Sequence, residues 1–335
     1  MASVSKTFCA FAAWKALLDS PAFSRESKMQ TILKLKQRNG SPPADPDFAD
    51  VRVRHLLESI SGIDQWAFRG SMKKLRDSND DPRPTQPASM ETLLGMVAEM
   101  EMNQDPGETI SYGKTDYILL GQVAAQLSKA SSFDVALKAL VLDPLKMTRT
   151  RSSRARVEDR APDEAMHHLS DLSTNTSAVH NDRRLVASQY GEENYNLFDG
   201  AGGISTAMVD LARLCAMFSC RTNNPVLPPS VLKAMFEAAV ASEATQGDHG
   251  HHGFDNPSGS DPTFTLDKGG SLPGVGSGFF GKTGKFFVTI ARNGPVDPNS
   301  MGPTDWNTDL YKMAKDIDWA GKDMFPQFGM PTLKP

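Results

Sequence analysis

The stretch Ala2-Ser3-Val4-Ser5-Lys6-Thr7-Phe8 opens this 335-residue chain and places a serine three residues before a lysine. Residues three apart on a helix share one face, so the Lys6 ammonium can reach the Ser3 hydroxyl. An apolar run through Leu18 follows, which predicts a core helix and a lysine whose pKa is lowered by burial. Such a lysine can act as a base for a serine nucleophile, and the helix N-terminus offers N–H groups to a developing oxyanion.

The same spacing occurs elsewhere, so it is weak as an isolated signal. The other pairs are Ser71/Lys74, Ser111/Lys114 and Ser230/Lys233. Ser71 precedes a polar, proline-broken run that cannot desolvate a lysine, and Ser230 opens an amphipathic segment where it is typical of a helix cap. The proposal for Ser3 therefore depends on partners from other parts of the chain.

Composition narrows the class of protein. The charged fraction of 23% and hydrophobic fraction of 39% are those of a soluble globular chain, and a net charge of −4 without a basic cluster argues against nucleic-acid binding. Three cysteines are too few for a disulfide framework or zinc site and are expected in the core. No apolar run can span a membrane, and Lys15 interrupts the first one, so we expect a core helix, not a cleaved signal, and a cytoplasmic chain by default.

Helical periodicity dominates the first three quarters of the chain. Helices are predicted at residues 28–35, 53–60, 90–102, 117–127, 133–142, 208–218 and 230–241. The fifth should end before Asp143-Pro144, because the residue before a proline disfavours helix. Residues 78–88 and 151–196 read as loops, and His55 lies within a helical apolar pattern that predicts a packed core histidine.

The last third of the chain changes period. Residues 263–267, 276–280 and 286–292 alternate or are β-branched and aromatic, which predicts antiparallel strands joined by glycine turns. A final helix at 304–317 should lie on the sheet, with an apolar face made of Trp306, Leu310, Met313 and Ile317.

Two other motifs suggest competing chemistry. His249, His251 and His252 form a cluster without carboxylate or cysteine support, which favours a solvated loop over a metal site, and we expect no metal or cofactor. Gly276–Thr283 matches the phosphate-loop pattern letter for letter, but a strand-like segment follows it where nucleotide binding requires a helix. A turn between antiparallel strands is therefore favoured over a nucleotide site.

An ordered series of segments points to one family. The segments are ASVSKTF, VRVRHLLESISGI, DPGETISYGKTDYILLG, VLDPLKMTRT, AGGISTAMVDLARL and DKGGSLPG. In this order the chain resembles the serine β-lactamase and penicillin-binding-protein-like hydrolases, closest to class C β-lactamases and their esterase relatives. The resemblance implies an α+β fold in a single domain over residues 1–335, with a mainly helical lobe (10–260) and an antiparallel sheet flanked by helices (261–320).

The resemblance also implies roles for particular residues. Ser3 would be the nucleophile that forms an acyl-enzyme with a small ester or amide substrate. Lys6 would take its proton or hold Tyr112 as phenolate, and Tyr112 would act as acid and base for the leaving group. The N–H groups of Ser3 and Ser271 would form the oxyanion hole.

Substrate binding is expected on the late strand and beside the tyrosine. Lys268, Gly269 and Gly270 correspond to the family's third motif, with Lys268 binding a substrate carboxylate or a developing anion. Lys114 stands where the family normally has an asparagine, and it adds a cation that only donates hydrogen bonds. This change weakens the expectation of β-lactam or peptide recognition and leaves ester chemistry open.

The family usually carries several dozen residues before its nucleophile, including two strands of the sheet. Here only Met1 and Ala2 precede Ser3, so the resemblance implies missing N-terminal strands, a truncated chain or a late start, and a sheet with an uncovered edge and apolar face. Two hypotheses follow: an active serine hydrolase, or a non-catalytic relative that keeps the fold as a binding or scaffolding module.

Overall fold

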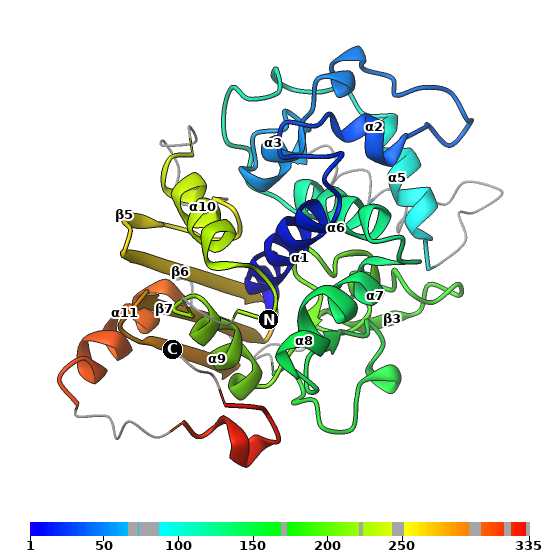
Figure 1. The fold of residues 1–335 in the computed structure, drawn as a ribbon. Coiled ribbons are helices and arrows are strands. Elements are labelled where there is room, and N and C mark those ends of the chain that lie inside the picture. The colour runs from blue at the N-terminus through cyan, green and yellow to red at the C-terminus, as the bar shows by residue number, and fades with distance from the viewer. Residues whose placement is uncertain are drawn as a thin grey trace.

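A helix through the centre of the molecule joins a sheet to a group of helices (Figure 1). The computed structural model describes residues 1–65, 73, 87–168, 173–220, 224–242, 251–294, 303–317 and 323–332. The central helix is α1 (Ser5–Asp19), preceded by a short 3-10 turn, η1 (Ala2–Val4). It lies between the strands and the helices that surround α6 (Thr115–Leu127).

The sheet is antiparallel throughout, in the order β5-β6-β7-β8. Its strands are β5 (Ser258–Ser260), β6 (Thr263–Leu272), β7 (Val275–Lys282) and β8 (Phe287–Asn293). The last three confirm the predicted strands. β5 was not predicted, because its sequence Ser-Gly-Ser lacks the β-branched and aromatic residues that mark a strand; pairing with β6 holds it in place.

Aromatic side chains cover the inner face of the sheet. Phe218 lies at the end of α9 (Met208–Met217), with its ring centroid 5.7 Å from that of Phe279 and 5.4 Å from that of Phe287. Phe236 of α10 (Pro229–Val240) packs in the same way on Phe264, at 5.5 Å. Tilted and edge-to-face ring contacts of this kind add to the energy of apolar burial.

Helix α11 (Pro303–Ala314) covers the opposite face, as predicted, but with a different side. Tyr311 stacks on Phe286 at 4.4 Å and contacts Phe280 at 5.1 Å. Met313 and Ile317, predicted to face the sheet, are 73% and 50% exposed. The aromatic contact of Tyr311 thus sets the rotation of the helix, and the expectation of an uncovered apolar face is wrong where α11 lies.

The helical part follows the predicted periodicity. It contains α2 (Met29–Leu33), η2 (Pro46–Ala49), α3 (Val53–Leu57), α5 (Met90–Ala98), α6, α7 (Phe133–Leu137), η3 (Lys138–Leu142) and α8 (Asp143–Leu145). The predicted stop before Asp143-Pro144 is wrong. Pro144 lies in the first turn of α8, where a missing N–H costs little, and the helix ends at Lys146 with a φ of 57°.

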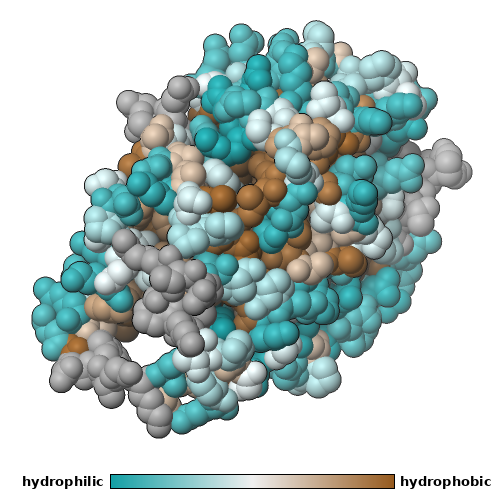
Figure 2. All heavy atoms as spheres, viewed as in Figure 1, coloured by the Kyte–Doolittle hydropathy of each residue, from teal (hydrophilic) through white to brown (hydrophobic). Residues whose placement is uncertain are grey.

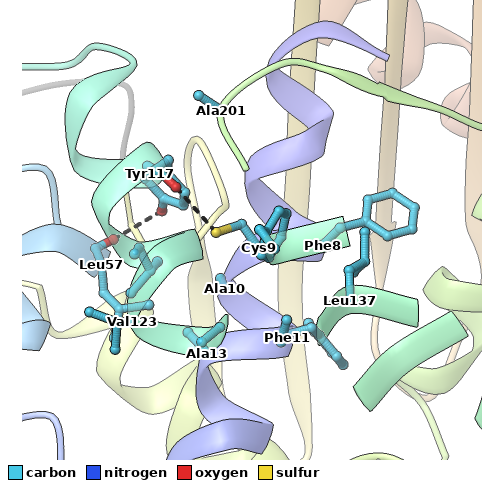
Figure 3. Close-up of a cluster of buried hydrophobic side chains, with 14 of the residues drawn as sticks. Phe8, Cys9, Ala10, Phe11, Ala13, Leu57, Tyr117, Val123, Leu137 and Ala201 are labelled. Atoms are coloured by element: carbon cyan, nitrogen blue, oxygen red, sulfur yellow. Dashed lines mark hydrogen bonds between the residues drawn. The ribbon is translucent and has the colours of Figure 1, made fainter. Parts of the chain in front are cut away.

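Helix α1 is buried along most of its length (Figure 3). It packs against α6, η3 and α7. The residues drawn include Phe8, Cys9, Ala10, Phe11, Ala13, Leu57, Tyr117, Val123 and Leu137. Alanines at positions 10 and 13 leave room for a close approach of the neighbouring helix. The Tyr117 hydroxyl donates to the Leu57 carbonyl at 3.0 Å. Cys9, Cys215 and Cys220 are all buried, which confirms their predicted core positions.

The predicted loop between residues 151 and 196 contains only short elements where it is described. These are β1 (Arg151–Ser152), η4 (Val157–Asp159), β2 (Thr174–Thr176), β3 (Leu185–Ala187) and η5 (Tyr195–Leu197). Beyond the loop, β4 (Ile204–Ser205) pairs with β1. A last 3-10 turn, η6 (Phe325–Phe328), lies near the C-terminus. Of the predicted loop at 78–88, residues 78–86 lie outside the described part.

Figure 2 shows mainly hydrophilic residues on the visible face, with hydrophobic ones gathered in its hollowed middle, where Figure 1 places α1 and α6. No helix in the described ranges is both long enough and apolar enough to cross a membrane.

The histidine cluster is not a solvated loop. His251 and His252 are 7% and 0% exposed, and His249 lies outside the described residues. The Trp14 indole N–H donates to His252 Nδ1 at 3.2 Å, and His252 Nε2 lies 3.4 Å from a carboxylate oxygen of Glu58. Burial of the polar His252 ring is possible because Trp14 and Glu58 lie against its two nitrogens. Within the described chain, no group of three or more His, Cys, Asp or Glu side chains could hold a metal ion.

His55 packs in the core, as predicted, where its Nδ1 accepts the Arg52 N–H at 3.2 Å. The phosphate-loop alternative is wrong, because Gly276–Lys282 lies inside β7 and the chain continues into β8. Thr283 is 3% exposed; its hydroxyl accepts from the Phe264 N–H and donates to the Pro262 carbonyl. The turn itself lies at Gly284, whose φ is 71°.

Candidate active site

The first two predicted residues lie together at the start of the central helix. Ser3 belongs to η1 and Lys6 to the first turn of α1, with Lys6 Nζ 3.4 Å from Ser3 Oγ. The Lys6 ammonium also donates to the Ala201 carbonyl at 2.9 Å, and its side chain is 2% exposed. Burial lowers the Lys6 pKa, and the nearby Tyr112 partly opposes this effect. The predicted proximity and the predicted direction of the pKa shift are both present.

Tyr112 comes from the segment just before α6 and lies between two lysines. Its ring centroid is 4.8 Å from Lys6 Nζ and 5.0 Å from Lys268 Nζ, and the Lys268 ammonium is 3.4 Å from the phenol oxygen. Burial alone would raise the pKa of the phenol. The positive charges of Lys268 and Lys6, together with a hydrogen bond from the Ser3 side chain, outweigh burial and lower the Tyr112 pKa to about 7. A phenolate is therefore accessible at neutral pH.

Lys268 reaches the site from the middle of β6 and is fully buried. It forms an ion pair with Asp255, and the second oxygen of that carboxylate accepts the Gly269 N–H at 2.8 Å. Burial opposes the charged form of Lys268, but Asp255 and Tyr112 raise its pKa above the ordinary value. Lys268 thus stays cationic beside the phenol.

Strand β6 runs directly past Ser3. A side chain at Gly270 would place its Cβ 2.9 Å from the Ser3 nitrogen and 2.6 Å from the Met1 carbonyl oxygen, so the backbones touch there. In antiparallel pairs alternate residues direct their N–H groups to the same side. The Gly269 N–H points away from β7, to Asp255, and the Ser271 N–H therefore points the same way, along the edge of β6 that meets η1.

This close approach makes Gly270 sensitive to substitution. We expect Gly270→Ala to lower kcat/KM for a p-nitrophenyl ester by about 100-fold, since the added methyl group must move β6 away from Ser3 and misplacement of this size is costly to catalysis. Gly202→Ala is the matched control, because its Cβ would have only ordinary contacts with Ala2, at 3.8 Å or more. Equal kinetics for the two variants would contradict the tight fit.

Lys114 lies near the site but is held by a partner that the sequence did not predict. Its ammonium pairs with Glu193 and lies 4.7 Å from the Phe198 ring centroid. It makes a small contribution to the lowered pKa of Lys6, as predicted for a third cation. The Glu193 carboxylate balances much of this charge, so the site is less cationic than the lysine count suggests.

Among the described residues, the Ser230/Lys233 pair does not form such a site. Ser230 is exposed on α10, and Lys233 pairs with Glu237 and Asp261 at 3.7 and 3.4 Å on the surface. This confirms the solvated lysine predicted there. Ser71 and Lys74 lie outside the described residues.

Sequence reasoning missed Asp255 and Glu193. Each lies in an irregular segment, and neither has a spacing that links it to Lys268 or Lys114. Only the fold brings these pairs together, so no local pattern could have found them.

Comparisons with known proteins concern the family and the fold. The sequence matches the family described as Beta-lactamase over residues 1–298. Comparison with curated proteins gives no significant match. Similar solved structures include an octameric penicillin-binding protein homologue from Pyrococcus abyssi, at 21% identity and a TM-score of 0.64, aligned over 94% of this chain and 64% of that one.

Two further structures have hydrolase names. D-amino acid amidase from Ochrobactrum anthropi, solved with D-phenylalanine, is 16% identical with a TM-score of 0.62, covering 94% of this chain and 91% of that one. EstCE1, a hydrolase with promiscuous acyltransferase activity, is 19% identical with a TM-score of 0.60, covering 88% and 78%. At these identities the likeness concerns the fold, and it confirms the β-lactamase/transpeptidase-like architecture. With its family match extending over residues 1–298, this chain belongs to the Beta-lactamase family, whose known members are serine hydrolases.

Proposed function

We propose that this protein is a serine hydrolase that cleaves a small ester or amide through an acyl-enzyme on Ser3. The observation that carries the proposal is the meeting of Ser3, Lys6, Tyr112 and Lys268 from three separate parts of the chain. Two buried lysines flank one phenol whose pKa is lowered to about 7. Perturbed groups that converge in this way are typical of catalytic sites.

In the proposed reaction the Tyr112 phenolate takes the Ser3 proton as Ser3 Oγ bonds to the substrate carbonyl carbon. The N–H groups of Ser3 and Ser271 would stabilise the oxyanion. The bond to the leaving alcohol or amine then breaks, and Tyr112 returns the proton to it. In the second half of the reaction, Tyr112 takes a proton from water as the water oxygen bonds to the acyl carbon. The bond to Ser3 Oγ then breaks, Tyr112 returns the proton to Ser3, and the acid is released.

Lys6 would act mainly by holding this arrangement. Its ammonium donates to both Ser3 Oγ and the Ala201 carbonyl, which fixes it between the helix start and the residues before β4. From this position its charge favours the Tyr112 phenolate. Of the two roles considered for Lys6, support of the phenolate is the one these contacts favour.

Substrate binding is proposed for Lys268, Gly269, Gly270 and Lys114. The backbone of β6 beside Ser3 can line the bound acyl group, and Lys268 can attract an anion. The D-amino acid amidase and EstCE1 names support amide or ester substrates as a class. Lys114, paired with Glu193, cannot both donate and accept as an asparagine would, which favours esters over β-lactams.

The second candidate is a non-catalytic binding or scaffolding protein of the same fold, favoured by the lysine at position 114. One experiment separates the two. Incubation with a fluorophosphonate should add one probe per chain, and peptide mass spectrometry should place it on Ser3, because only an activated serine reacts. Full occupancy on Ser3 supports the hydrolase. Failure to label the folded protein supports the binding module.

A further inference from the structure

Asp255 lies directly behind Lys268 and uses both carboxylate oxygens on β6. One oxygen pairs with the Lys268 ammonium, and the other accepts the Gly269 N–H at 2.8 Å. The side chain of Asp255 is 2% exposed. A buried carboxylate is costly unless it is paired and hydrogen-bonded, and here both conditions are met.

The backbone around Asp255 is tied to the same strand. The Asp255 N–H donates to the Asp267 carbonyl at 3.0 Å, and the Asn256 N–H donates to the Asp267 carboxylate at 2.9 Å. These bonds fix the distance between Asp255 and the residues of β6 on either side of Lys268. The carboxylate therefore cannot follow the lysine if the lysine moves.

The residues before Asp255 tie it to the nucleophile helix as well. The Gly253 carbonyl accepts the Thr7 hydroxyl at 2.6 Å, and a Cβ at Gly253 would lie 2.8 Å from Thr7 Cα. The His252 N–H donates to the Leu57 carbonyl at 2.9 Å, and the His252 ring is held by Trp14. Asp255 is thus placed relative to both α1 and β6.

We infer that Asp255 is a positioning residue of this site, one that pairs with Lys268 from two anchored elements, balances the positive charge of the two lysines and so acts on Tyr112 through Lys268. The role of Asp255 in catalysis rests on the proposed function. The geometry behind it, a buried ion pair anchored on two elements, does not depend on whether the protein turns over a substrate. None of the sequence motifs described above includes Asp255.

The charges around Tyr112 determine the direction in which its pKa should change when Asp255 is neutralised. Lys268 and Lys6 favour the phenolate, Ser3 stabilises it by a hydrogen bond, and Asp255 opposes it. Neutralising Asp255 therefore removes a charge that disfavours ionisation of Tyr112. The phenolate then becomes the nearest anion to Lys268, and the Tyr112 pKa falls.

Groups farther from the phenol act on Tyr112 through Lys6. The positive charges of Lys268 and Lys114 lower the Lys6 pKa, and the buried carboxyl of Asp116 lies close enough to interact with Lys6. They affect both the wild type and the variant, so they leave the sign of the expected change intact.

The test is a tyrosinate absorbance titration of the folded protein with Asp255→Asn. The chain has five tyrosines, and burial raises the pKa of each of the other four (Tyr117, Tyr190, Tyr195 and Tyr311), so Tyr112 titrates alone near neutral pH. We expect its midpoint to fall by about 1 pH unit, the size typical of one neighbouring charge. The readout needs no catalysis, so it is separate from the labelling of Ser3.

Asp267→Asn is the matched control: Asp267 is also buried on β6, and an asparagine there keeps an oxygen that can accept the Asn256 N–H. Its midpoint should equal that of wild type. A midpoint in Asp255→Asn that stays or rises would overturn the inference. If Asp255→Asn does not fold, Lys268→Gln is compared with the double variant Lys268→Gln, Asp255→Asn, which removes the buried pair together. The double variant should have the lower midpoint, and equal midpoints would overturn the inference.

Discussion

Replacement of Ser3 by alanine is expected to lower kcat/KM for a p-nitrophenyl ester by about 10⁴-fold and to abolish fluorophosphonate labelling. Loss of a nucleophile leaves only the residual acceleration from the oxyanion hole and from binding, which is why effects of this size are typical. Ser3 is partly buried at the start of α1, and the change removes a hydroxyl without changing the helix. Stopped-flow or steady-state kinetics on the purified variant would measure it.

The chain offers a control with the same spacing. Ser230→Ala alters the serine of the Ser230/Lys233 pair. Ser230 is exposed on α10, and Lys233 forms its ion pairs with Glu237 and Asp261 on the surface. It should keep wild-type kinetics and full labelling. If Ser3→Ala retained more than a tenth of the activity, the acyl-enzyme proposal for Ser3 would be wrong.

The second large effect is expected for Tyr112→Phe. Removing a general acid and base typically costs between 10² and 10⁴ in rate, and we expect about 10³ here. In wild type, kcat/KM should rise with pH through a midpoint near the Tyr112 pKa of about 7, because the phenolate is the proton acceptor. In the variant, kcat/KM should no longer rise with pH near 7, and the tyrosinate absorbance that appears near this pH should be absent.

Tyr311→Phe provides the comparison, since Tyr311 stacks on Phe286 on the far face of the sheet and its pKa is raised by burial. It should leave the pH profile and the early absorbance unchanged. A Tyr112→Phe variant with the wild-type pH profile would show that another group, with Lys6 the first candidate, takes the proton from Ser3.

The fold was predictable where apolar periodicity is strong. The buried face of α1 and the β-branched run of β8 define their elements without help from the rest of the chain. Tertiary contacts decided the remainder. Pro144 continues a helix because it occupies a first-turn position, and β5 forms because β6 offers it a partner. The sequence alone could not reveal either condition.

The site likewise has features that a local pattern predicts and others that depend on tertiary contacts. Ser3 and Lys6 were predictable from their spacing, while Tyr112 and Lys268 were found through family resemblance in ordered segments. The distances among them depend on how β6 passes η1, which no local pattern determines. The predicted solvation of the histidines failed because His252 meets Trp14 and Glu58, residues from distant parts of the chain.

The burial of helix α1 has a consequence for the proposed reaction. Because Lys6 and the rest of the first turn are packed against α6 and Ala201, their conformational entropy is lost once, when the chain folds, and would not be lost again in each cycle of that reaction. In the proposed mechanism the reacting groups are thus preorganised by the interior. The short strands β2 and β3 supply none of the residues proposed for the chemistry, so they can vary to suit different substrates, which would let evolution change specificity and mechanism separately.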